Sequence, residues 1–139
     1  MPKKSARIWA IAGLGLAATI AGARAETISL VAYLTGRAAV PANDGSAFGQ
    51  AQFTYDSDTR RLDYVVTYDG LPAAQVEIHG PADAGQNGPM LIPFPTPESP
   101  VSGAVILSRA QSRGLLDGKL YVDVHSAGYG EIRGQIERQ

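Results

Sequence analysis

The chain contains no cysteine, and its 139 residues include only two histidines and one tryptophan. Without cysteine there is no disulfide bond, no iron–sulfur cluster, no cysteine-bound zinc and no thiol nucleophile. The folded part must therefore be held together by an apolar core and by sheet hydrogen bonds. Any metal site would have to be built from imidazole nitrogens and carboxylate oxygens.

The chain also lacks an apolar run long enough to span a bilayer. Its longest run covers residues 8–23, which is 16 residues, whereas a spanning helix needs about 20. Three basic side chains and no acid precede the run, without paired arginines, and residues 23–25 read ARA. This order predicts a Sec-type secretory signal peptide over residues 1–25, cut before Glu26, and a secreted or periplasmic protein with no membrane span after cleavage. An uncleaved membrane anchor is the alternative.

An excess of positive charge is absent as well. The whole chain has 12 basic and 13 acidic residues, and the predicted signal peptide holds four of the basic ones. Residues 26–139 therefore carry 8 basic and 13 acidic side chains, a formal charge of −5. This balance argues against a nucleic-acid partner and against docking on anionic lipid. The remaining candidates are a protein or another ligand of the cell envelope.

What the mature sequence does contain is a series of alternating strands. Apolar and polar residues alternate with the period of two that a half-buried strand requires. The predicted strands cover residues 27–34, 47–55, 62–68, 76–79, 90–92, 101–107, 120–125 and 132–136. We therefore predict an all-β fold, an antiparallel immunoglobulin-like sandwich or Greek-key barrel of about seven to eight strands, as one domain over residues 26–139.

Turn and loop signals separate these strands. Asp-Gly pairs at 44–45, 69–70 and 117–118 predict tight turns, because glycine accepts a positive φ without steric cost. Residues 80–89 form a loop rich in Gly, Pro and Asn, and residues 93–100, with four prolines, predict an extended and exposed connection. The only helix candidate is residues 108–116.

Two short motifs hold both histidines. Residues 77–81 read EIHGP and are followed by NGP at 87–89, while residues 121–126 read YVDVHS and 130–135 read GEIRGQ. With LTG at 34–36, VP at 40–41 and GL at 70–71, these motifs make residues 34–136 resemble the CHRD domain. That module is named after chordin and also occurs alone in many bacterial secreted proteins. The motif residues are His79, Gly80, Pro81, Asn87, Gly88, Pro89, His125, Gly130, Glu131, Arg133 and Gly134.

The resemblance implies a β-rich, immunoglobulin-like or barrel-like fold and an extracellular role. It implies no established reaction, and in chordin the domain accompanies growth-factor-binding modules, which suggests a binding or scaffolding part. This chain departs from the family pattern at three positions: Glu77 replaces a histidine, Asp123 an asparagine and Ser126 a threonine. If the paired histidines of the family bind a metal, the exchange at Glu77 weakens that function here.

Strand geometry indicates how the motif side chains point. Residues two apart share a face of a strand, so Glu77 lies beside His79, Asp123 beside His125 and Glu131 beside Arg133. If the three strands are neighbours, one face carries three acids, two imidazoles and one guanidinium. We predict that Arg133 pairs with Asp123 or Glu131, since a planar guanidinium suits a carboxylate.

Three interpretations of this face are open. It is a solvated outer face, as any half-exposed strand requires, or a buried hydrogen-bonded network beneath a loop, or a metal site. In the last, His79 and His125 with Glu77 or Asp123 would bind Zn²⁺ or Cu²⁺. We predict no other cofactor.

The sequence shows no catalytic constellation. Ser126 follows His125 directly, and neighbours on a strand point to opposite faces, so the serine is not the partner of that imidazole. There is no nucleophile elbow, and the glycines of residues 80–88 lack the lysine and helix of a phosphate loop. We therefore predict a non-enzymatic, secreted binding or structural module, with a metal-binding periplasmic protein as the alternative.

Overall fold

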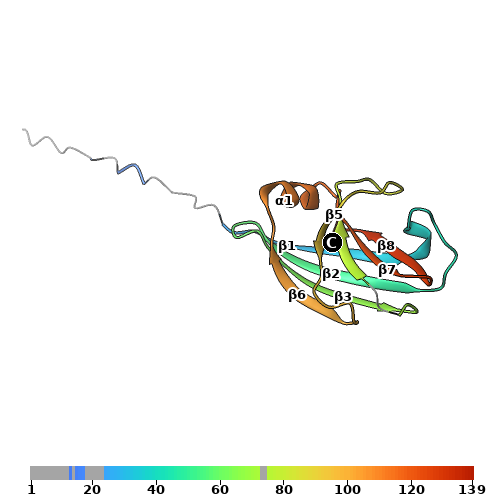
Figure 1. Cartoon of the computed structure of the whole chain (residues 1–139). Helices are drawn as coiled ribbons and strands as arrows, with labels where there is room; N and C mark the ends of the chain where they lie inside the picture. The colour runs from blue at the N-terminus through green and yellow to red at the C-terminus, as the bar shows by residue number, and fades with distance from the viewer. Residues whose placement is uncertain (1–12, 14, 18–23, 73–74) are drawn as a thin grey trace, which may run out of the picture.

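A computed structural model of the chain describes residues 13, 15–17, 24–72 and 75–139 (Figure 1). Most of the predicted signal peptide lies outside these residues, so the signal peptide stays a prediction. No helix in the described part of the chain is long and apolar enough to cross a membrane.

The described residues form a single antiparallel sheet of nine strands with little helix. The strands are β1 (Thr27–Thr35), β2 (Phe48–Asp56), β3 (Arg61–Asp69), β4 (Gln75–His79), β5 (Met90–Pro93), β6 (Val101–Ile106), β7 (Tyr121–Ser126), β8 (Gly130–Gln135) and β9 (Glu137–Arg138). The helices are the 3₁₀ turn η1 (Gly36–Ala38) and α1 (Arg109–Leu116). The all-β prediction is confirmed.

Hydrogen bonds link the strands in the order β5-β4-β7-β8-β1-β2-β3-β6, and β9 adds to β1. The sheet curls into a half-barrel, with α1 at one end (Figure 1). This continuous hydrogen-bonded path does not divide the strands into two facing sheets. Neither the immunoglobulin-like sandwich nor the Greek-key barrel is therefore confirmed, and the sheet has one strand more than the upper limit we predicted.

The concave face of the sheet holds the apolar core. Alternate residues of each long strand point inward and are almost fully buried, as the period-two pattern predicts. The core comprises Ile28, Leu30, Leu34, Phe53, Tyr55, Leu62, Tyr64, Val66, Val76, Ile78, Ile92, Phe94, Val101, Leu107, Leu115, Leu120, Val122, Val124, Ile132 and Ile136, with Ala32 and Ala51. This core replaces the disulfides that the chain lacks.

The predicted helix is confirmed. Ser108 is its N-cap, and the Ser108 hydroxyl accepts from the Gln111 amide while the Gln111 side chain accepts from the Ser108 amide. This capping box satisfies two amides that the first turn would otherwise leave unpaired. The turn glycines Gly70 and Gly118 have positive φ, as predicted, whereas Gly45 does not and lies in the loop before β2.

The connection between β5 and β6 is exposed over most of its length, as predicted, but one of its residues enters the core. Phe94 is buried and stacks on Tyr64, with ring centroids 4.0 Å apart, and the Tyr68 amide donates to the Ser99 hydroxyl. The Phe94 ring therefore anchors the proline-rich segment to the core. Composition alone does not reveal this tertiary contact.

Candidate functional site

The three strands that carry the motifs lie side by side as β4-β7-β8. Glu77 faces Asp123, which faces Arg133, and one row along, Gln75 faces His125, which faces Glu131. The intervening Ile78, Val122, Val124 and Ile132 are buried in the core. The prediction that the polar motif residues share one face is therefore confirmed.

Both histidines converge on one carboxylate oxygen. Glu77 Oε2 lies 2.7 Å from His79 Nε2 and 3.3 Å from His125 Nε2. Asp123 Oδ2 lies 3.8 Å from the same His79 nitrogen. The side chains of Glu77, His79 and Asp123 are mostly buried, whereas that of His125 is 38% exposed. We call these four residues the motif cluster.

The other ring nitrogen of His79 fixes the orientation of the imidazole. Nδ1 lies 3.1 Å from the Gly88 carbonyl oxygen, which can only accept, so Nδ1 carries a proton. In the neutral ring Nε2 is then a lone pair aimed at two carboxylates. A second proton or a cation is needed to make that contact attractive.

The carboxyl groups respond to this crowding in opposite directions. Burial raises the pKa of Asp123 to about 8, and a hydrogen bond and repulsion from Glu131 act in the same direction, against the attraction of Arg133. Asp123 Oδ1 is buried and has no hydrogen-bond partner. Burial also acts to raise the pKa of Glu77, but hydrogen bonds from His79 and His125 outweigh it and lower that pKa.

The predicted pairing of Arg133 with a carboxylate is wrong: no ion pair joins it to Asp123 or Glu131 within the described ranges. Arg133 is only 1% exposed, and its guanidinium lies over the Tyr121 ring, 3.5 Å from the centroid. It donates to Asn87 Oδ1 and the Asp83 carbonyl, at 3.3 and 3.1 Å. The guanidinium stacks on Tyr121 and donates to the loop oxygens, so it does not pair with Asp123, which faces it on β7.

The loop of residues 80–89 is held over this face by several contacts. Gln135 Nε2 donates to the Ala82 carbonyl at 2.8 Å, and the Gly88 amide donates to the Tyr121 hydroxyl at 2.9 Å. Asn87 Nδ2 donates to the Val40 carbonyl, 47 residues earlier in the chain. The loop therefore lies over β7 and β8 and shields Arg133 from water.

Comparison with protein families matches residues 30–136 to the CHRD domain model. The chain belongs to the CHRD domain family. Neither the curated proteins nor the solved structures contain a significant match. The CHRD motifs thus correspond to the strands and the loop that build the cluster.

Two CHRD motif glycines are required by close backbone approach. Gly80 has a φ of +145°, and a β-carbon there would lie 2.6 Å from the Lys119 carbonyl oxygen and from Leu120. A β-carbon on Gly134 would overlap the backbone of Tyr33 on β1. These glycines let the loop meet the β7 end and let β8 pack against β1.

Some residues of the CHRD site were not predicted. Tyr121 is 2% exposed and joins Arg133 to the loop. Because Tyr121 is two residues from Asp123 and four from His125 on one strand, the sequence could have placed it on the same face. Asp83 and Gln135 hold the loop through a carbonyl and an amide, contacts that depend on the loop path. Of the three interpretations, the buried network beneath a loop describes Arg133, whereas Asp123 Oδ1 is buried without a hydrogen-bond partner.

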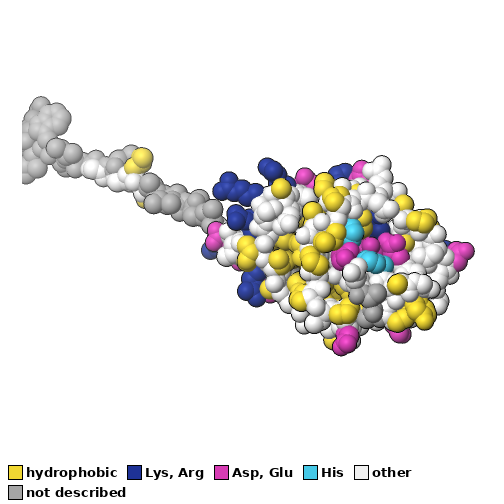
Figure 2. Space-filling view, viewed as in Figure 1, with side chains coloured by type: hydrophobic (Ala, Val, Ile, Leu, Met, Phe, Trp, Pro, Cys, Tyr) yellow, Lys and Arg dark blue, Asp and Glu magenta, His cyan; other side chains and the backbone are white. Residues whose placement is uncertain are grey.

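The motif cluster remains open to the surface. Figure 2 shows both histidines on one face of the molecule, together with acidic side chains. A hollow of about 400 Å³ adjoins them, lined by Val40, His79, Asn87, Gly88, Tyr121, Asp123, His125 and Glu131. A small ion or ligand can therefore reach His125 and Asp123 from solvent.

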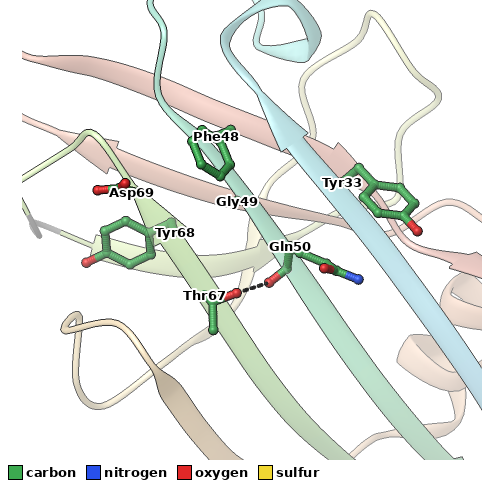
Figure 3. Close-up of a pocket in the computed structure, with 7 residues that line it drawn as sticks. All are labelled: Tyr33, Phe48, Gly49, Gln50, Thr67, Tyr68 and Asp69. Atoms are coloured by element: carbon green, nitrogen blue, oxygen red, sulfur yellow. Dashed lines mark hydrogen bonds between the residues drawn. The ribbon is translucent and has the colours of Figure 1, made fainter.

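A second hollow lies on the convex face of β1, β2 and β3 (Figure 3). Tyr33, Gln50 and Thr67 lie side by side across β1, β2 and β3, with Phe48 next to Asp69, the one acid of the hollow, one row along. The rings of Tyr33 and Phe48 are 65% and 60% exposed. This hollow lacks the converging titratable groups of the motif cluster, so the cluster is the candidate functional site.

Proposed function

We propose that this CHRD protein is an exported, non-enzymatic binding module that holds a transition-metal ion, zinc or copper, in the motif cluster. The observation that carries the proposal is the convergence of His79 Nε2 and His125 Nε2 on Glu77 Oε2, with Asp123 Oδ2 beside them. Two imidazoles and two carboxylates are a donor set that suits Zn²⁺ and Cu²⁺.

The spacing of the donors supports a metal. A tetrahedral ion with bonds of about 2.0–2.1 Å keeps its ligand atoms about 3.3–3.4 Å apart. The donor atoms of Glu77, His79 and Asp123 lie within 4.8 Å of one another, with contacts of 2.7 and 3.8 Å to His79 Nε2. His125 Nε2 lies 3.3 Å from Glu77 Oε2, so this half-exposed side chain would rotate to join an ion held by the other three.

The hydrogen bonding around the cluster supports the same conclusion. The Gly88 carbonyl accepts a hydrogen bond from His79 Nδ1, so the lone pair of Nε2 is available as a metal ligand. Metal-binding histidines are usually oriented in this way. A cation among Glu77, His79 and Asp123 would neutralise the Glu77 carboxylate, take the place of the Asp123 proton, and make the approach of Nε2 to these oxygens favourable.

A catalytic role is not favoured by the remaining groups. CHRD domains are non-catalytic modules, and Ser126, the nearest hydroxyl on the chain to His125, is buried on the core face. The metal therefore serves to stabilise the module or to join it to an envelope partner.

Isothermal titration calorimetry of the purified protein tests the proposal. We expect one Zn²⁺ or Cu²⁺ per chain with a Kd of about micromolar or tighter. Glu77→Gln and His125→Ala should each weaken binding at least about tenfold, which corresponds to 1.4 kcal/mol. His125 is the safer variant for folding, because it is half-exposed.

The matched control is Asp63→Asn. Asp63 is also an aspartate on a strand, but it is exposed and pairs with Arg61, far from the histidines in the sheet order. Equal binding by the wild type and Asp63→Asn is expected. Absence of binding at about 100 μM metal, or binding that neither cluster variant weakens, would exclude the metal.

Export is tested separately. The order of charged, apolar and small residues before Glu26 predicts cleavage there. Mass spectrometry of protein from the secreted or periplasmic fraction should give a chain that begins at Glu26. A cell-associated chain that retains residues 1–25 would contradict export by cleavage without affecting the metal proposal.

A further inference from the structure

The two edges of the sheet differ in how they are protected. At one edge, β5 has four residues, begins after Pro89 and ends on Pro93, and its pairing with β4 shifts register between Ile78 and His79. Shortness, proline and irregular register are devices by which proteins prevent edge-to-edge pairing.

The opposite edge, β6, also begins directly after a proline, Pro100, but it lacks the other two features. It pairs in regular register with β3 over six residues, Val101–Ile106, with no charge and no proline among them. In the part of the chain that the structure describes, no strand follows β6 in the sheet, and its backbone makes no hydrogen bond to an element other than β3.

Exposure confirms that this edge is open. Other long strands alternate between buried and exposed residues, whereas Ser102, Gly103 and Ala104 are exposed in succession. Ile106 at the end of the strand is 58% exposed. A row of solvent-exposed amides and carbonyls on an uncharged strand is a template for another strand.

We propose that β6 pairs antiparallel with β6 of a second copy of this chain. The strand suits a two-fold axis, because an antiparallel pair places residues of the same face opposite each other. An axis through Gly103 sets Ser102 opposite Ala104 and Val101 opposite Val105 of the second copy. No charge meets a like charge, and side chains of similar size face each other.

The dimer formed in this way is weak and concentration-dependent. Pairing of five residues, Val101–Val105, buries less than the about 1,200 Å² of a standard stable interface. Dissociation constants of about 10 μM to 1 mM are the range to examine. The motif cluster lies on β4 and β7, and β8, β1, β2 and β3 separate it from β6, so it takes no part in the contact.

Sedimentation velocity of the processed protein tests the proposal. It is measured at protein concentrations of about 10 μM to 1 mM in the presence of a chelator. We expect a shift from monomer to dimer as concentration rises. Ala104→Lys should weaken the association about tenfold, since it places two desolvated ammonium groups beside the seam. The control Gln52→Lys, on the same face but on the inner strand β2, should leave it unchanged.

A second measurement does not depend on a variant. Hydrogen exchange of wild-type amides in residues 101–106 should slow as the protein concentration rises. A monomer throughout the range, a dimer that Ala104→Lys does not weaken, or a dimer whose β6 amides exchange at an unchanged rate would each overturn the proposal. A dimer that the chelator abolishes would also overturn it, whereas failure of metal binding would leave it intact.

Discussion

At the scale of single residues, Asp123 departs most from its ordinary chemistry. Its carboxyl group is 6% exposed, neighbours Glu131 and Glu77, and has a pKa raised to about 8. In the metal-free protein it therefore keeps a proton at neutral pH, while the same group in the unfolded chain, with its ordinary pKa of 3.8, has lost it. The folded state binds more protons than the unfolded state between these two values.

We predict that Asp123→Asn stabilises the metal-free protein at alkaline pH. Because the folded-state pKa is raised, the wild type loses stability as pH rises from about 4 to about 8, and an amide at this position does not titrate. The free energy of unfolding of the variant should exceed that of the wild type by several kcal/mol near pH 8, and the difference should nearly vanish near pH 4.

Urea denaturation with a chelator, at several pH values, measures this difference. Asp63→Asn serves as the control, since Asp63 is exposed. A difference between wild type and Asp123→Asn that does not change with pH would show that Asp123 ionises normally in the folded protein.

At the scale of elements, Arg133 joins β8 to the loop of residues 80–89. Its fork reaches the Asp83 carbonyl and Asn87 while its plane lies on Tyr121. A lysine ammonium is a point charge and cannot make these contacts together.

Arg133→Lys should therefore lower the free energy of unfolding by about 2–3 kcal/mol and speed amide exchange in residues 82–88. Arg138→Lys, on the exposed strand β9, is the matched control and should change neither quantity. Equal effects of the two substitutions would mean that Arg133 does not hold the loop.

Much of the element structure could be predicted from sequence. The period-two alternation located β1, β2, β3 and β7, and α1 lies within the predicted helix of residues 108–116. The parity of Glu77, His79, Asp123 and His125 placed them on one face, because parity depends only on strand geometry. The partner of Arg133 could not be predicted, because it depends on where the loop returns over the sheet.

At the scale of the whole molecule, the order of the strands in the sheet could not be predicted from the sequence. The sheet places β4 beside β7, although 41 residues separate the end of one from the start of the other. The two histidines meet on Glu77 only because of this pairing. One continuous curled sheet also leaves two edges, and a local pattern cannot tell which strands form them.

The proposed metal site requires two imidazoles and two carboxylates to converge on one ion. The most direct test is anomalous X-ray diffraction at the zinc edge from crystals grown with Zn²⁺. We predict one strong anomalous peak about 2.0–2.1 Å from His79 Nε2 and His125 Nε2, with Glu77 and Asp123 as the remaining ligands. Crystals of zinc-saturated protein with no peak among these four side chains, or with zinc only at surface positions elsewhere, would contradict it.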